Sequence, residues 1–235
     1  MNFQTGEILA IDKPYGMSSF GALAHIRYIL SKRMKHKVKI GHAGTLDPLA
    51  TGVLVLCTGK KTKEIERLQA HTKEYVATLQ LGATTPSYDR EHAVNHTYPV
   101  QHITREMVEE TLRQFVGEID QVPPTYSAVK VNGDRAYALR RAGEVVELKA
   151  KKVRIDEIEL LGYDHQLKQV TIRVVCGKGT YIRSLARDLG RALQSGAFLT
   201  QLRRTQSGDF RVEQCISFDH FSEWLDEQEI EPFQD

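Results

Sequence analysis

This sequence of 235 residues has few cysteines and no long apolar stretch. No run approaches the roughly 20 apolar residues that a membrane-spanning helix needs. The start, MNFQTGEILAID, lacks the basic residues and apolar core of a signal peptide. The three cysteines (Cys57, Cys176 and Cys215) are far apart and fit no metal-site spacing. These absences predict a cytoplasmic protein without a membrane segment, and 26% charged residues are typical of a globular chain.

Cofactor signatures are also missing. Gly59-Lys60-Lys61-Thr62 resembles the end of a phosphate loop, but Leu54 stands where that loop requires a glycine. The sequence contains neither a nucleophile elbow nor a dinucleotide fingerprint. His92, His96 and His102 lie in a polar stretch without a nearby cysteine or a helical histidine pair, which favours exposed histidines over metal ligands. We therefore expect no cofactor and no metal.

Acidic residues are absent between Asp12 and Asp47. That gap contains a cluster of bases: Arg27, Lys32, Arg33, Lys35, Lys37 and Lys39. In contrast, residues 209–235 carry nine acids and one base, a charge of −8, which leaves +10 for residues 1–208 of a chain whose net charge is +2. A solvated helix end explains most charge runs, but such faces normally mix signs. The basic body predicts a polyanionic partner.

One carboxylate stands alone in the stretch GHAGTLDPLATG, residues 41–52. Glycines surround Asp47, and Pro48 biases it toward an extended or turn conformation. The apolar run Val53–Cys57 follows. An acid held on a stiff turn beside a buried strand could be a positioned reactive group. On local grounds alone, ordinary turn chemistry is the favoured explanation.

The hydrophobic pattern predicts single helices between strand runs. Helices are expected from Ser18 or Ser19 to Arg33, over Lys60–Ala70, from Thr104 to Val116 and over Thr180–Gln194. Strands are expected over Glu7–Asp12, Val53–Cys57, Glu74–Leu81, Val153–Leu161, Gln169–Cys176 and Phe198–Arg204, and a closing acidic helix over Asp219–Glu229. Because regular βαβ alternation is missing, the pattern favours an α+β fold with a mixed, mostly antiparallel sheet and flanking helices.

A second candidate site begins at Gly177-Lys178-Gly179-Thr180-Tyr181-Ile182-Arg183. Two glycines lead from a strand into a helix whose first turn carries a tyrosine and an arginine. Such a helix start suits an anion. A plain connector with an exposed arginine explains the pattern equally well.

Taken together, these segments resemble the TruB-type tRNA pseudouridine-55 synthases. The motifs occur in the family's order and span residues 12–205. They are Asp12-Lys13-Pro14 with Gly16-Met17-Ser18-Ser19, GHAGTLDPLATG, Lys73-Glu74-Tyr75, Pro123-Pro124-Thr125-Tyr126-Ser127-Ala128-Val129-Lys130, GKGTYIRSLARDLG and residues 196–205. The resemblance implies the pseudouridine synthase fold with a thumb-like insertion at about 123–150.

The implied reaction converts a uridine in the tRNA T-loop to pseudouridine on a flipped-out base. By its place in the motif, Asp47 is the nucleophile, already ionised at neutral pH. The resemblance assigns substrate contacts to His42, Tyr75, Tyr181, Arg183 and Leu202, with Arg183 pairing with Asp47 and Tyr75 stacking on the base. Lys13 and Pro14 would shape the site, while Lys32, Arg33, Lys35 and Lys37 would grip RNA backbone.

Two departures from the family pattern are visible. Members commonly continue into a small RNA-binding domain of the PUA type, whereas only 30 residues follow Thr205 here, and they are acidic. We therefore expect a single catalytic domain over 1–235, acting as a monomer on the T-arm. Pro86 stands where an aspartate is expected. Two alternatives stay open: a synthase that acts on another RNA, and a non-catalytic RNA-binding or tRNA-folding protein.

Overall fold

The first helix begins at a serine cap. Ser18 has an extended backbone, and its hydroxyl accepts a hydrogen bond from the N–H of Gly21 at 3.0 Å. Helix α1 (Ser19–Met34) ends at Lys35, which has a left-handed φ of 51°. The predicted helix from this cap to about Arg33 is confirmed.

The computed structural model describes residues 1–127, 130–131, 134–142, 144 and 146–233. The chain forms two compact units, one of residues 1–75 with 203–235 and one of residues 76–202. Parts of the insertion expected at 123–150 lie outside the described residues, namely 128, 129, 132, 133, 143 and 145, as do the last two residues of the acidic segment. Among the described residues, no helix has the length and apolar character needed to cross a membrane.

The first unit contains β1 (Ile8–Lys13), α1, β2 (Ile40–His42), β3 (Ala50–Thr58), η1 (Gly59–Glu64), α2 (Ile65–Ala70), β13 (Phe210–Arg211), η2 (Val212–Gln214), β14 (Ile216–Ser217) and α6 (Phe221–Asp226). The second contains β5 (Ala83–Thr84), β6 (His96–Thr97), α3 (Arg105–Arg113), β7 (Gly117–Gln121), β8 (Lys130–Val131), β9 (Asp134–Arg135), α4 (Ala136–Arg141), β10 (Lys151–Asp164), β11 (Gln169–Cys176) and α5 (Ile182–Ala192). Strands β4 (Lys73–Leu81) and β12 (Ala197–Ser207) have residues in both units.

The main sheet is mixed, with the strand order β14-β1-β3-β12-β4-β11-β10-β7. Strands β1 and β14 pair in parallel, whereas β1–β3, β2–β3, β10–β11 and β7–β10 pair antiparallel. Register along β1–β3 places Asp12 opposite Val53 and Lys13 opposite Gly52. The predicted α+β class with a mostly antiparallel sheet is confirmed.

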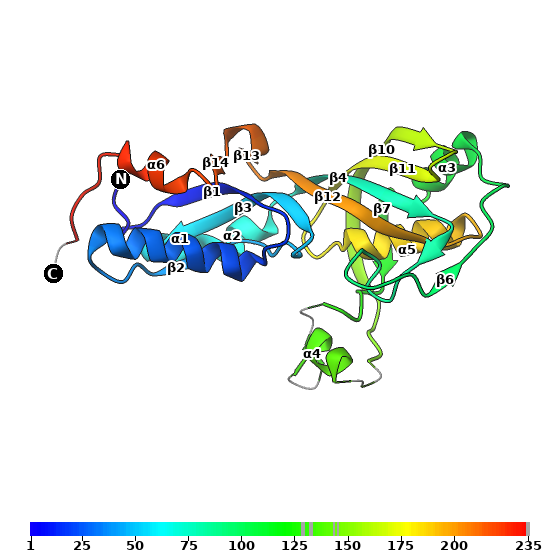
Figure 1. Ribbon diagram of the computed structural model, residues 1–235, viewed down its shortest axis with the longest axis horizontal. Coiled ribbons are helices and arrows are strands. Elements are labelled where there is room, and N and C mark those ends of the chain that lie inside the picture. The colour runs from blue at the N-terminus through cyan, green and yellow to red at the C-terminus, as the bar shows by residue number, and fades with distance from the viewer. Residues whose placement is uncertain (128–129, 132–133, 143, 145, 234–235) are drawn as a thin grey trace. The chain divides into compact units, whose positions relative to one another are not determined.

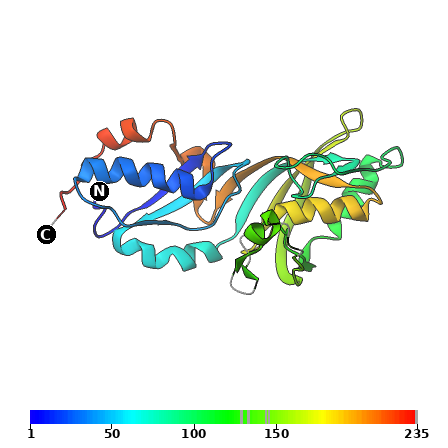
Figure 2. The same ribbon diagram turned by 60° about the horizontal axis from the view of Figure 1, so that its bottom comes forward.

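In the first unit, strand β3 is buried on both faces, which explains its unbroken apolar run. Leu54 and Leu56 pack on one side with α1 and α6, whereas Val53, Val55 and Cys57 pack on the other with Leu68 of α2. Figure 2 shows α1 and α6 side by side, with α2 on the opposite side of the strands. This two-sided packing fixes β3, the strand into which the Asp47 segment leads.

In the second unit, buried and half-buried residues alternate along β11, as a half-buried strand requires. Helix α5 is largely buried, and its arginine side chains at 183 and 187 are among the buried charged groups. Figure 1 shows α4 on a segment that extends away from the strands of this unit. The start of α5 carries two of the candidate site residues, Tyr181 and Arg183.

Candidate functional site

The Asp47 segment joins β2 to β3 and is anchored by its backbone. The N–H of Ala50 donates to the Asp47 carbonyl at 3.0 Å, which closes a turn. The N–H of Gly16 donates to the Pro48 carbonyl at 2.9 Å. Asp47 itself is half-buried. The segment is therefore a turn, as the sequence predicted, and the structure adds that Pro48 is hydrogen-bonded to Gly16 in the turn after β1.

Lys13 anchors the same turn from inside the protein. Its side chain is fully buried, and Nζ donates to the carbonyls of Met17 at 2.6 Å, Pro14 at 2.8 Å and Pro48 at 3.4 Å. Burial lowers the pKa of Lys13 to about 8, and the carboxylate of Asp47 partly opposes this shift. Lys13 and the half-buried Pro14 thus shape the turn beside Asp47.

Arg204 of β12 supports the segment from a second direction. It is 1% exposed, and its guanidinium donates to the carbonyls of Val53 at 2.7 Å, Gly44 at 3.1 Å and Thr45 at 3.4 Å. Gly52 permits the close approach, because a Cβ there would lie 2.1 Å from the Arg204 carbonyl oxygen. The backbone on both sides of Asp47 is therefore held by a buried cation.

Ser19 ties the first turn of α1 to the residue before Asp47. Its hydroxyl accepts from the N–H of Leu46 at 2.7 Å and donates to the Leu46 carbonyl at 3.0 Å. Both groups are buried, so neither can turn to water. Helix α1 thereby fixes the backbone position of the residue before Asp47.

His42 ends β2, and it is half-buried. Burial, with the nearby charge of Arg204, lowers the pKa of His42, so the imidazole is neutral at pH 7. Its Nδ1 is buried and has no hydrogen-bond partner within the described part of the chain. A buried ring nitrogen without a partner is unusual in a folded protein, which supports a role for His42 in the site.

Two further predicted substrate residues lie on the strands shared by the units. Tyr75 on β4 is 9% exposed. Leu202 on β12 is half-buried. Tyr75 supplies an aromatic ring, and Leu202 supplies an apolar side chain.

Arg183 is held at the start of α5 in the second unit. It is 4% exposed, and its guanidinium donates to the carbonyls of Tyr126 at 3.0 Å and Ser87 at 3.3 Å. Its Nε lies 3.8 Å from Oδ2 of Asp89. Asp89 is buried and accepts from the Ser87 hydroxyl at 2.6 Å. The predicted Arg183–Asp47 pair joins residues of different units and stays a prediction.

Tyr181 precedes α5 and is half-buried. Its N–H donates to Oε1 of Gln121 at 2.8 Å. The Gln121 amide nitrogen is buried, and no described residue accepts a hydrogen bond from it. A buried amide donor therefore lies beside the start of α5.

The basic loop, which we define as residues 32–37, comprises the end of α1 and the residues that follow it. Lys32, Arg33, Lys35 and Lys37 are all exposed, as an RNA-contacting role would require. Arg33 lies 3.9 Å from Asp226 of α6, and the ring of Phe233 stacks on His36 with 4.2 Å between centroids. The acidic segment therefore runs next to the basic loop within the first unit.

Residues 32–182 match the TruB family pseudouridylate synthase N-terminal domain, and residues 183–233 match the tRNA pseudouridylate synthase B C-terminal domain. The chain belongs to the TruB family. It is 62% identical to tRNA pseudouridine synthase B of Bacteroides thetaiotaomicron, over 100% of this chain and 99% of that one. The corresponding protein of Flavobacterium johnsoniae is 50% identical over 94% of this chain and 96% of its own length.

The TruB fold also appears among solved structures. A chain in the crystal structure of a Cbf5-Nop10-Gar1 complex has a TM-score of 0.71 and 31% identity, over 97% of this chain. The present chain spans 58% of the length of that chain. The resemblance to the family and the predicted pseudouridine synthase fold are thereby confirmed.

Four residues that contact the site segments were given no functional role from the sequence. Ser19, Gln121 and Arg204 lay inside the quoted motifs or next to them without an assigned role, and Asp89 lay in the segment that drew attention only for Pro86. One signal was available for Arg204, because an arginine inside a predicted strand needs polar partners if the strand buries it. The partners themselves are carbonyls about 150 positions earlier and could not be read from the pattern.

Proposed function

We propose that this chain isomerises uridine to pseudouridine in the T-loop of tRNA, at position 55, with Asp47 as the catalytic carboxylate. Full-length similarity to tRNA pseudouridine synthase B supports the reaction and the substrate class. The observation that carries the assignment of Asp47 is the arrangement of its segment, where Lys13, Ser19 and Arg204 fix the backbone around one carboxylate.

The reaction breaks the bond between N1 of uracil and C1′ of ribose and forms a bond between C5 and C1′. The proton on C5 is lost and N1 gains one, so no group is transferred. A carboxylate can assist in two ways, by attacking C1′ or by attacking the uracil ring. Asp47 is suited to either because an ionised aspartate needs orientation more than activation, and a fixed backbone provides it.

Base access and water exclusion are assigned to the remaining predicted residues. The target base must leave its loop, and Tyr75 would stack on it, a contact worth about 1–3 kcal/mol at nucleic-acid sites. We assign His42, Tyr181, Arg183 and Leu202 to the substrate, with Arg183 orienting Asp47. The monomeric state and the cytoplasmic location expected from the sequence stay predictions.

The variant Asp47→Asn tests the function. Replacing the nucleophile should abolish release of tritium from a T-arm RNA labelled at C5 of uridine, because that release requires the C5–C1′ bond to form. Affinity for the RNA should stay within about threefold of the original, since less than about 0.7 kcal/mol of binding is at stake. The control is Asp209→Asn, an exposed aspartate on a turn of the same unit. Normal turnover by Asp47→Asn would refute the assignment.

The alternatives need a separate measurement. Total RNA treated with the protein can be mapped for new pseudouridines. A single site in the T-loop supports the proposal, sites in other RNAs identify a synthase of different specificity, and no site at all with intact binding identifies a non-catalytic RNA-binding protein.

A further inference from the structure

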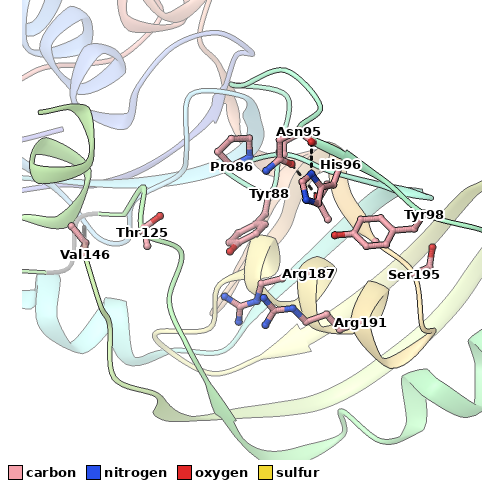
Figure 3. Close-up of a pocket in the computed structure, with 13 residues that line it drawn as sticks. Pro86, Tyr88, Asn95, His96, Tyr98, Thr125, Val146, Arg187, Arg191 and Ser195 are labelled. Atoms are coloured by element: carbon pink, nitrogen blue, oxygen red, sulfur yellow. Dashed lines mark hydrogen bonds between the residues drawn. The ribbon is translucent and has the colours of Figure 1, made fainter. Parts of the chain in front are cut away.

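A pocket of about 550 Å³ lies wholly within the second unit. Its walls are formed by residues 84–88, by residues 95–98, by Arg187 and Arg191 of α5, and by both ends of the segment around α4 (Figure 3). The lining residues are Thr84, Thr85, Pro86, Tyr88, Asn95, His96, Tyr98, Thr125, Val146, Arg187, Arg191, Ser195 and Gly196. None of these is among the substrate residues that the sequence predicted.

Two arginines give the pocket its charge. Arg187 is 6% exposed, and its guanidinium is held by the carboxylate of Asp188 at 2.8 and 3.1 Å and by the Val122 carbonyl at 3.0 Å. It lies over the Tyr88 ring, 5.2 Å from the centroid. Arg191, one turn later on the same face of α5, is exposed and forms no ion pair with any described residue. Both arginines line the pocket (Figure 3).

No carboxylate is among the described residues that line the pocket. A metal ion or another cation would therefore lack its usual ligands. With Arg187 balanced by Asp188, the unpaired charge of Arg191 leaves the pocket positive. An anionic group of the ligand is favoured, and a guanidinium suits phosphate geometry in particular.

The pocket is also lined by an aromatic residue, Tyr98, and an amide, Asn95. The N–H of Tyr98 donates to the Gly82 carbonyl at 2.8 Å, and Gly196 leaves room for its ring, since a Cβ there would lie 2.5 Å from a ring carbon. Oδ1 of Asn95 accepts from the Thr84 hydroxyl at 3.0 Å, so the Asn95 amide nitrogen is available as a donor. A planar group with acceptor atoms fits this wall.

We propose that the pocket binds one nucleotide of the RNA substrate, with its phosphate on Arg191 and Arg187 and its base against Tyr98 and Asn95. The identity of the ligand as RNA rests on the proposed function. The flanking sequence supports a strand rather than a free molecule, because residues 125–146 carry four bases (Lys130, Arg135, Arg140 and Arg141) against two acids (Asp134 and Glu144). The pocket is thus a second RNA contact, apart from the residues assigned to the target uridine.

The test compares two arginines that differ only in their relation to the pocket. Arg191 lies in the last turn of α5, and Arg113 lies exposed in the last turn of α3 in the same unit, outside the pocket. Arg191→Ala should weaken binding of a T-arm RNA about 10- to 100-fold, as loss of a charge-assisted contact does. It should also lower the slope of log affinity against log salt by about 0.7 to 0.9. Arg113→Ala should change neither value, and equal behaviour of the two variants would overturn the proposal.

Three further readouts separate the possible failures. The melting temperature of Arg191→Ala should equal that of the original protein, whereas misfolding would lower it. A photo-crosslinker at position 98 should label RNA, whereas one at Leu161, which is 46% exposed, should not. If uridine monophosphate, and not RNA, bound in an Arg191-dependent manner, the RNA assignment would be wrong. Because RNA binding is measured without turnover, it distinguishes failure of this proposal from absence of synthase activity.

Discussion

At the scale of single residues, Asp89 holds Arg183 without being part of the predicted substrate set. Asp89 is buried with the guanidinium of Arg183 3.8 Å away, and the Ser87 hydroxyl and the N–H of Glu91 both donate to its Oδ1. We expect Asp89→Asn to keep this geometry but to lose the charge. A loss of about 1.5–3 kcal/mol in orienting Arg183 corresponds to roughly 10- to 100-fold in turnover.

Single-turnover rates and RNA affinity measured on the same Asp89→Asn protein check this prediction. A positioning role predicts slower turnover with an unchanged dissociation constant. The matched control is Asp164→Asn, which removes an exposed aspartate at the end of β10 in the same unit. A fall in affinity with normal turnover would contradict the positioning role.

Lys13 makes the Asp47 turn sensitive to alkaline pH. Its pKa is lowered by burial to about 8, whereas the unfolded chain has the ordinary value of 10.5. Above pH 8 the neutral amine has only two N–H donors for the three carbonyls that Nζ binds. The turn is then held less firmly, so turnover should fall. Between pH 8 and 10.5 the unfolded chain binds more protons than the folded one, and linkage through Lys13 therefore raises stability with pH.

Opposite pH trends in turnover and in stability would identify Lys13 as the titrating group. Turnover should decline above pH 8 while the melting temperature, compared with that of Lys13→Met at each pH, does not decline. Lys13→Met should have low activity and no decline of its own near pH 8. A decline that persists in the variant would assign the titration to another group.

At the scale of elements, helix α1 is joined to the Asp47 turn by the hydrogen bonds of Ser19. Two neighbouring serines separate their contributions, because Ser18 caps the helix whereas Ser19 binds Leu46. Either serine to alanine should cost about 1–2 kcal/mol of stability. Only Ser19→Ala should also slow turnover, since only that hydroxyl holds the residue before Asp47. Thermal melts combined with initial rates check this, and equal rates in the two variants would show that the helix does not position the turn.

The elements that the sequence predicted are those with their own periodicity or caps. Helix α3 begins after Thr104, whose hydroxyl caps it, and β11 has the predicted bounds. The pattern missed β2 and β7, because β2 has three residues and β7 exposes Glu118 and Asp120. Such strands exist through their partners, β3 and β10. Likewise, Asp47 was predicted from its own motif. The contacts that hold its turn come from residues distant in sequence, such as Arg204, and were not predicted.

At the scale of the whole molecule, opposite charges gather in different segments of the first unit. The acidic segment packs Phe221 and Leu225 into the core next to α1, and its outer side places Asp226 near Arg33. Both side chains of that pair are at least half exposed, and such pairs contribute only about 0–1 kcal/mol. The basic loop therefore keeps most of its attraction for a polyanion.

This leads to a prediction about salt. Replacing Lys32, Arg33, Lys35 and Lys37 by glutamine should reduce the slope of log RNA affinity against log salt by about 0.7 to 0.9 for each phosphate contact that is lost. The matched control replaces four exposed lysines elsewhere, Lys60, Lys63, Lys151 and Lys152, and gives the same net charge. Titrations at several salt concentrations measure both slopes. If the control lowers the slope as much, RNA responds to the net charge of the molecule and the loop makes no phosphate contact of its own. If only the loop variant does so, the acid-free stretch between Asp12 and Asp47 contains both the proposed catalytic turn and a grip on the RNA backbone.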